Sequence, residues 1–308
     1  MRNGETGVEI PHSAFRIPHS LPRRLIVSAD DFGLSPGVNA GIIRAHRDGI
    51  LSDASLMVNG AAVDEAVELA RATPTLSVGL HLVLVQGRAT TPPREISGLV
   101  DAAGMFRNNS VAVGVRYFFT PGVRAQLERE ICAQLEKYLR TGLTLSHVDG
   151  HLNIHMHPTM LGILVRVAER YGIRAMRLPR EPLGVSLRLD GRSRLRKTVE
   201  AVIFRALAAF AMPRLQAHGI RYPDQMFGLH QSGHVTEPYL LGILDALSPG
   251  VTEIYSHASL IDAEAHRWRP ADYESEAELA ALTSPRVRAA LSEKQITLTS
   301  YCALSGGA

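Results

Sequence analysis

The chain alternates between short apolar runs and longer segments in which apolar residues recur every three or four positions. The short runs predict buried strands, and the longer segments predict amphipathic helices packed on one face. The expected strands cover residues 24–29, 55–58, 77–85, 143–147, 173–178, 251–256 and 296–301. The expected helices include residues 36–48, 63–71, 123–139 and 158–171, and residues 86–110 are expected to form a long loop.

Repeated alternation of strands and helices predicts parallel strands with helices outside them. Seven or eight such units in 308 residues favour an irregular, TIM-like (β/α) barrel over an open doubly wound sheet. No G-x-G-x-x-G sequence follows the first strand, which argues against a dinucleotide-binding fold. We expect residues 1–22 to be a flexible lead-in and residues 23–308 a single domain with a helical insert around 183–222.

Composition and charge favour a globular protein and argue against a nucleic-acid-binding one. Apolar residues make up 45% of the chain and charged residues 20%, as in ordinary globular proteins. The net charge is +3, and no dense Lys/Arg stripe with interleaved aromatic residues indicates nucleic-acid binding. Cys132 and Cys302 cannot build a disulfide framework, and no apolar run suits a signal peptide or a spanning helix. These features favour the cytoplasm as the location of the protein.

The candidate chemical residues lie where predicted strands end. Asp30 and Asp31 follow the first strand, His81 lies within the third, and His257 follows a late one. Four more histidines and Asp149 fall between residues 147 and 157. The carboxyl ends of barrel strands form the catalytic face, so these groups are expected to share one site. Histidines with carboxylates are typical of a metal-dependent hydrolase.

Each signal taken alone has a plainer interpretation. The aspartate pair could cap a turn, His81 could be a hydrogen-bonded core residue, and His257 could lie in an exposed loop. Within the cluster, His151 and His155 are spaced as on one helix face, whereas His155 and His157 alternate as on a strand. Asp149 could orient a ligating imidazole from behind, and His155 stays an alternative ligand.

Three motifs resemble the YdjC/ChbG-type carbohydrate deacetylases. They are residues 24–35 followed by 39–43, residues 79–82, and Ser146–His151 with His155. The resemblance implies an irregular barrel that removes N-acetyl groups from amino sugars with one divalent metal ion, Mg or Zn. By position it implies that Asp31, His81 and His151 hold the metal, that Asp30 is the general base and that His257 is the general acid. Ala258 departs from the proline that many members have after the last histidine.

Two further segments, residues 178–181 and 227–233, resemble the hopanoid-associated HpnK-like subgroup. That resemblance implies an N-acetylglucosaminyl hopanoid as substrate. Peripheral contact with the inner membrane is a separate expectation, which rests on the next segment. Residues 195–215 mix arginines with apolar residues, a pattern typical of a helix at a membrane interface or over a lipid tail. The same pattern also suits a helix packed on the barrel.

Other functions fit parts of the pattern. A deacetylase of soluble chitooligosaccharides would need the same residues. Another barrel metallohydrolase could use His155-Met156-His157 as an H-x-H pair, although such a pair is expected on the first strand. A non-catalytic lipid or sugar carrier could keep the barrel without the chemistry. The sequence predicts no oligomeric state.

Overall fold

The computed structural model describes residues 22–306, so almost all of the predicted lead-in lies outside the described residues. Seven parallel strands form one sheet in the order β4-β3-β2-β1-β6-β5, and β7 pairs with the first residues of β1. The strands are β1 (Arg23–Phe32), β2 (Asp53–Leu56), β3 (Ser77–Leu82), β4 (Val148–Gly150), β5 (Gln225–Phe227), β6 (Gly250–Ser256) and β7 (Ile296–Leu298). The parallel α/β prediction is therefore confirmed.

Residues 173–180 connect the two ends of this sheet. Val148 on β4 bridges to Met176, and Ala175 bridges to Arg221. The amide of Met226 on β5 donates to the carbonyl of Arg180 at 3.3 Å. The sheet thus curves into an irregular barrel, in which the predicted strand at 173–178 survives only as isolated bridges.

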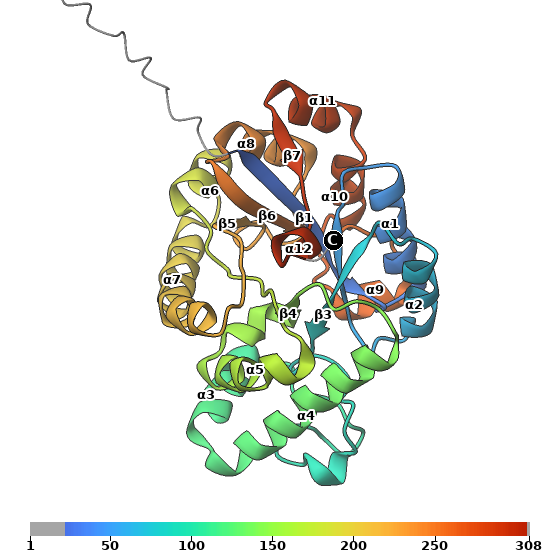
Figure 1. Cartoon of the computed structure of the whole chain (residues 1–308), viewed down its shortest axis with the longest axis vertical. Coiled ribbons are helices and arrows are strands. Elements are labelled where there is room, and N and C mark those ends of the chain that lie inside the picture. The colour runs from blue at the N-terminus through green and yellow to red at the C-terminus, as the bar shows by residue number, and fades with distance from the viewer. Residues whose placement is uncertain (1–21, 307–308) are drawn as a thin grey trace, which may run out of the picture.

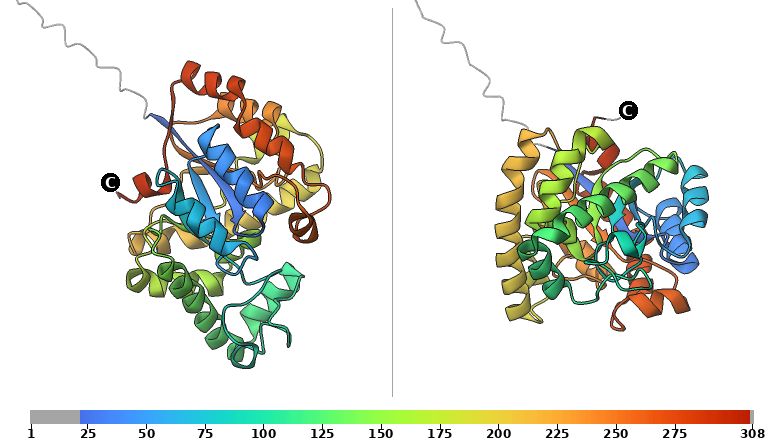
Figure 2. Two further views of the ribbon diagram at one scale, coloured as in Figure 1. Left: turned by 90° about the vertical axis from the view of Figure 1, so that its right-hand side faces the viewer. Right: turned by 90° about the horizontal axis from the view of Figure 1, so that it is seen from below.

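Helices surround the strands on the outside (Figures 1 and 2). They are α1 (Pro36–Arg47), α2 (Val63–Arg71), α3 (Ser110–Phe119), α4 (Pro121–Arg140), α5 (Pro158–Tyr171), α6 (Leu183–Leu189), α7 (Arg194–Ala217), α8 (Glu237–Ala246), α9 (Ala263–Trp268), α10 (Ser275–Leu282), α11 (Pro285–Glu293) and α12 (Tyr301–Leu304). Two 3-10 helices, η1 (Pro93–Glu95) and η2 (His151–Met156), lie in the connections. No helix between residues 22 and 306 is long and apolar enough to cross a bilayer.

Several predicted boundaries were wrong. The fourth strand is Val148–Gly150, not residues 143–147, so it carries Asp149 itself. The second strand begins at Asp53 and ends at Leu56, the third stops at Leu82, and the last stops at Leu298. Tyr301, predicted as strand, begins α12. Short strands depend on pairing with distant neighbours, which periodicity along the chain does not report.

Candidate active site

Two adjacent aspartates end β1 and point to different partners. Asp31 has a φ of 68°, a left-handed conformation that costs energy in any residue other than glycine. The register between β1 and β2 shifts between Ala29 and Phe32, at the same place. This irregularity sends the Asp30 side chain to a buried arginine and the Asp31 side chain to two histidines. Both carboxylates are buried, with exposed fractions of 4% and 1%.

Asp31, His81 and His151 form a cluster whose ligand atoms all lie within 4.8 Å of one another. The Oδ1 of Asp31 is 3.6 Å from Nε2 of His81 and 3.3 Å from Nδ1 of His151. That oxygen is buried and has no hydrogen-bond partner in the described structure. A buried carboxylate oxygen without a partner is costly, and a cation between these three atoms would satisfy it.

His81 is oriented for ligation by Asp149. Its Nδ1 lies 2.8 Å from Oδ1 of Asp149 and must donate, because a carboxylate only accepts. The opposite nitrogen, Nε2, is thereby left free to face Asp31. Burial lowers the pKa of His81, but Asp149, Asp30 and Asp31 outweigh burial and raise it to about 9. The cluster therefore favours positive charge at this point, which a divalent ion would supply.

A second group, made of Asp30, His81 and Asp149, has similar spacing but no free oxygen. Both Asp30 oxygens accept from Arg177 at 2.8 Å. In Asp149, one oxygen accepts from His81 and the other accepts from Ser55 and pairs with Arg177. The donor set therefore fits a metal at Asp31, His81 and His151 rather than at this group.

Arg177 lies at the centre of the buried charges. Its side chain is fully buried, its guanidinium is 4.6 Å from the centroid of the Tyr255 ring, and its Nε donates to Glu253 at 3.0 Å. The bidentate bonds to Asp30 fix that carboxylate in one orientation. Sequence reasoning missed this residue. The available signal was a charged position within the apolar run at 173–178.

His257 follows β6 and is 8% exposed. Its backbone amide donates to Glu278 at 2.5 Å, and its ring lies 4.9 Å from the Tyr273 ring. Burial lowers the pKa of His257 to about 4, against the raising effects of Asp31 and Asp30. The ring is therefore neutral near pH 7, and its buried Nδ1 has no hydrogen-bond partner in the described structure.

Arg269 connects Asp31 to His257. Its NH2 lies 3.1 Å from Oδ2 of Asp31, and its NH1 donates to the His257 carbonyl at 2.7 Å. Burial raises the pKa of Asp31, but the neighbouring His151 ring and the Arg269 charge hold it well below its ordinary value. Sequence reasoning missed Arg269 because it lies far along the chain, in no recognisable motif.

The other cluster histidines point away from the candidate metal position. His155 contacts the Arg177 carbonyl through Nε2 at 3.0 Å. His157 accepts from the amide of Thr159 at the start of α5. His147 stacks on Tyr301 with ring centroids 3.9 Å apart. The helix-face interpretation of His151 and His155 was wrong, because Leu152 and Asn153 take left-handed φ values of 52° and 54° and turn the chain between them. The strand-face interpretation of His155 and His157 was wrong because η2 continues to Met156.

Comparison with known proteins places this geometry in context. The model of the YdjC-like protein family matches residues 24–293. A carbohydrate deacetylase of Geobacillus stearothermophilus is 32% identical over 283 residues, covering 91% of this chain and 98% of the relative. A Mus musculus carbohydrate deacetylase is 32% identical over 304 residues, covering 91% and 94%. The crystal structure of a proposed cellobiose-phosphate cleavage protein from Enterococcus faecalis superposes with a TM-score of 0.73 at 26% identity, covering 92% of this chain and 99% of that one.

Proposed function

The chain belongs to the YdjC-like protein family, and from that membership we propose that it removes the N-acetyl group from an N-acetylglucosamine-containing glycoside. The observation that carries this proposal is the unpartnered Oδ1 of Asp31, which faces two imidazole nitrogens. Beside it, Arg177 holds a second carboxylate, Asp30, in one orientation. The relatives named carbohydrate deacetylase support the same reaction.

In the proposed mechanism Asp31, His81 and His151 hold a divalent ion. When bound, that ion would polarise the acetamide carbonyl and lower the pKa of a water molecule. Two imidazoles and one carboxylate suit Zn, which the general affinity order also favours, and the family resemblance includes Mg. Asp149 keeps His81 in the tautomer that ligation requires.

Asp30 is the proposed general base. Each oxygen of Asp30 accepts one hydrogen bond from Arg177, which fixes the orientation of the carboxylate. Each oxygen keeps a second lone pair that can accept a proton from water. His257 is the proposed general acid, which protonates the departing amine nitrogen. Because its ring is neutral in the resting protein near pH 7, the protonated form has to arise during the catalytic cycle.

For the glycoside we propose an N-acetylglucosaminyl hopanoid, with soluble chitooligosaccharides as the alternative. The resemblance at residues 178–181 and 227–233 supports the lipid-linked sugar. A lipid-linked substrate lies in a membrane, so the proposal includes peripheral contact with a bilayer. Trp268, which precedes Arg269 in the chain, lines a hollow of about 540 Å³ together with Gln86 and Asn108. Its indole offers an aromatic surface for a sugar ring.

We also propose the cytoplasm as the compartment. Cys132 and Cys302 are both free thiols in the described structure. Free thiols persist in a reducing compartment.

Acetate release tests the reaction. Protein loaded with Zn or Mg is incubated separately with chitobiose and with an N-acetylglucosaminyl hopanoid, and acetate and free amine are measured. A deacetylase releases both in equal amounts, loses the activity in a chelator and regains it when metal is restored. Binding of either sugar without acetate release would identify a carrier. Equal kcat/KM for both substrates would remove the lipid-linked sugar and leave the deacetylase standing.

A further inference from the structure

Helix α7 has apolar residues on two opposite faces. On the inner face, Ala208, Ala211 and Leu215 are buried against the rest of the molecule, together with the charged Lys197. The outward face is apolar as well: Leu195 is 79% exposed, Val202 is 64% exposed, and Val199 and Ile203 are each 50% exposed. Ala206, Ala209 and Pro213 extend the same exposed stripe toward the end of the helix. We call these seven residues the outer stripe of α7.

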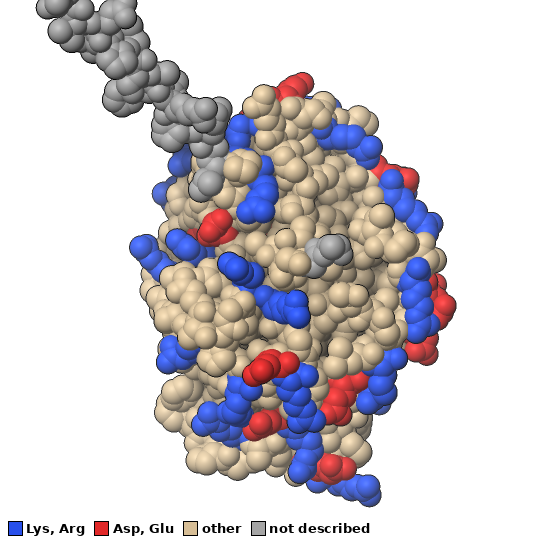
Figure 3. Space-filling view, viewed as in Figure 1, with Lys and Arg blue, Asp and Glu red and all other residues tan. Residues whose placement is uncertain are grey.

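Arginines border the outer stripe on both sides. At 3.6 residues per turn, Arg196 and Arg214 fall along one flank and Arg194 and Arg205 along the other. The single acidic residue of α7, Glu200, lies 2.8 Å from Arg196. Figure 3 shows the result as a tan area over α7 with blue side chains around it. An apolar surface bordered by positive charge is complementary to an anionic lipid bilayer.

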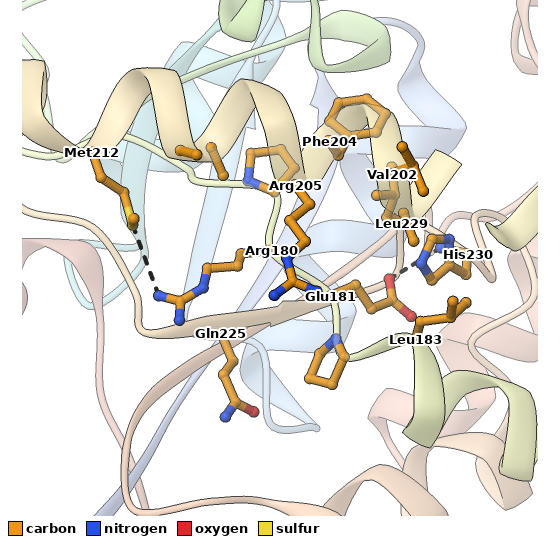
Figure 4. A pocket seen from close by; sticks show the side chains of 15 residues that line it. Arg180, Glu181, Leu183, Val202, Phe204, Arg205, Met212, Gln225, Leu229 and His230 are labelled. Carbon is orange, nitrogen blue, oxygen red and sulfur yellow. Dashed lines mark hydrogen bonds between the residues drawn. The ribbon is translucent and has the colours of Figure 1, made fainter. Parts of the chain in front are cut away.

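A pocket of about 530 Å³ opens beside the stripe, between α7 and residues 179–183. Val202 and Ala209 belong to both the stripe and the pocket lining. Arg180 and Arg205 extend into the pocket, and neither forms an ion pair among residues 22–306 (Figure 4). Among the described residues, the one hydrogen-bond partner of the Arg180 guanidinium is the sulfur of Met212, at 3.9 Å. Glu181 also lines the pocket, but its carboxylate accepts from the Ser186 hydroxyl and the His230 amide and not from either arginine. Two guanidinium groups without an ion pair, beside apolar walls, suit a phosphate that carries an apolar chain.

The wall of the pocket contains one more polar atom without a partner. His230 lines it, is fully buried, and its Nε2 has no hydrogen-bond partner in the described structure. The Nδ1 of the same ring is 3.3 Å from Glu200. A buried ring nitrogen without a partner has a desolvation cost that a ligand oxygen or water molecule would offset.

We propose that the outer stripe of α7 docks on an anionic lipid bilayer, with lipid phosphates at Arg180 and Arg205. A second copy of the chain is the less suitable occupant, because a symmetric contact would bring the flanking arginines of both copies together. This surface deepens the peripheral contact included in the proposed function, but its test is independent of deacetylation. Phe204, which lines the pocket and packs against Met226, Leu229 and Tyr255, faces inward and is outside the stripe.

Vesicle co-sedimentation tests this surface. The probes are vesicles of phosphatidylcholine alone and of phosphatidylcholine mixed with phosphatidylglycerol. The full chain should bind the mixed vesicles more tightly, and added salt should weaken the binding. Val199→Asp and Val202→Asp should each weaken it by about tenfold or more, because aspartate is both polar and repelled by the anionic surface. Arg205→Ala should weaken it about fivefold. The matched control is Leu139→Asp on α4, where the leucine is 43% exposed and far from the stripe, and it should bind like the wild type.

Equal binding by wild type, Val199→Asp and Val202→Asp would overturn the proposal, as would equal binding to both kinds of vesicle. Sedimentation velocity provides a second measurement: a dimer that Val199→Asp abolishes would assign the stripe to a second copy instead. Thermal melting should leave Val199→Asp unchanged, since half of that side chain already faces solvent. Acetate release from chitobiose separates the two proposals. Vesicle binding without deacetylation would remove only the proposed reaction, and deacetylation without vesicle binding would remove only the docking surface.

Discussion

Arg177 shows how a single buried residue organises the candidate catalytic groups. Its guanidinium contacts Asp30, Asp149 and Glu253, and each contact is 3.0 Å or shorter. Asp149 in turn holds His81. The proposed base and the proposed metal ligand are therefore oriented by the same side chain. Removing one partner from a buried charge network costs roughly 3–5 kcal/mol, so substitution of Arg177 would disturb folding as well as chemistry.

The division of labour between the adjacent aspartates yields the first prediction. Asp31→Ala, His81→Ala and His151→Ala should each lose bound metal, because each removes one of the three ligand atoms. Asp30→Asn should keep the metal and lose turnover by about 10²–10⁴-fold, the usual contribution of a general base. Metal content by elemental analysis and the rate of acetate release measure the two effects.

Two outcomes would reject this assignment. If Asp30→Asn binds as little metal as Asp31→Ala, the two carboxylates do not have separate roles. If His155→Ala loses metal while His151→Ala keeps it, the choice of ligand among the clustered histidines is wrong. The contact between His155 and the Arg177 carbonyl argues against the second outcome.

Tyr301 is predicted to be a positioning residue. Its hydroxyl donates to Glu253 at 2.6 Å, and Glu253 accepts from Arg177, which holds Asp30. Tyr301→Phe should lower kcat by about tenfold and leave KM and metal content unchanged, because only the orientation of Asp30 is loosened. Tyr117→Phe is the matched control, since it removes another buried hydroxyl, one that donates to the Leu84 carbonyl. If both variants lower stability equally and neither changes kcat, Tyr301 has only a structural role.

At the scale of elements, local signals predicted those helices whose ends are set by neighbouring residues. Ser35 caps α1 by accepting from the Val38 amide, and Pro36 occupies its first turn, where the helix was predicted to begin. Helix α2 has the predicted bounds, Val63–Arg71. The apolar stripe of α4 is buried from Val123 to Leu135, although Leu139 is 43% exposed. Such features can be read from residues only a few positions apart.

The strands and the buried arginines of the candidate site were harder to predict from the sequence than these helices. Val148–Gly150 is a strand because β3 pairs with it, a contact between segments almost 70 residues apart. Arg177 and Arg269 reach the candidate site from segments without a motif, and nothing local records that their partners are aspartates near residue 30. The proposed metal ligands were recognisable because their residue types are rare in apolar surroundings. Their supporting residues were not.

Strand β3 depends on a glycine where it packs against His147, the residue before β4. A Cβ on Gly79 would collide with the ring and the carbonyl of His147. Gly79→Ala should therefore destabilise the protein by about 1–3 kcal/mol and weaken metal binding, because His81 lies two residues further along the same strand. Urea unfolding and metal titration measure the two effects.

Gly162 on α5 is the control for that substitution, since nothing lies within 4 Å of an added Cβ there. Gly162→Ala should raise stability by about 0.5–1 kcal/mol, because alanine suits a helix interior better than glycine, and metal affinity should not change. Wild-type stability in Gly79→Ala would show that β3 or His147 can move aside, and the proposed need for glycine at this contact would be wrong.

For the whole molecule, the dependence of stability on pH tests how Asp53 fastens the C-terminal helix to the barrel. Asp53 on β2 is fully buried, accepts from the Tyr301 amide at 3.0 Å and accepts from the Ser52 hydroxyl at 2.7 Å. Burial outweighs these hydrogen bonds and raises its pKa from 3.8 to about 7. The folded protein thus keeps a proton on Asp53 between about pH 4 and pH 7 that the unfolded chain releases.

The free energy of unfolding should therefore fall as pH rises through that interval. The contribution of Asp53 to this fall is about 1.4 kcal/mol per pH unit. Asp53→Asn cannot ionise and should lack this contribution, so the stability of the variant relative to wild type should increase between pH 5 and pH 8. Burial lowers the pKa values of His147 and His155 to about 4, which makes stability rise with pH in both proteins. Subtracting the wild-type free energy of unfolding from that of the variant removes this shared effect. Urea unfolding of metal-free protein followed by circular dichroism measures it, with the exposed Asp48→Asn as control. A difference that stays constant with pH would mean that Asp53 is ionised throughout, and that its contact with α12 is held by a carboxylate.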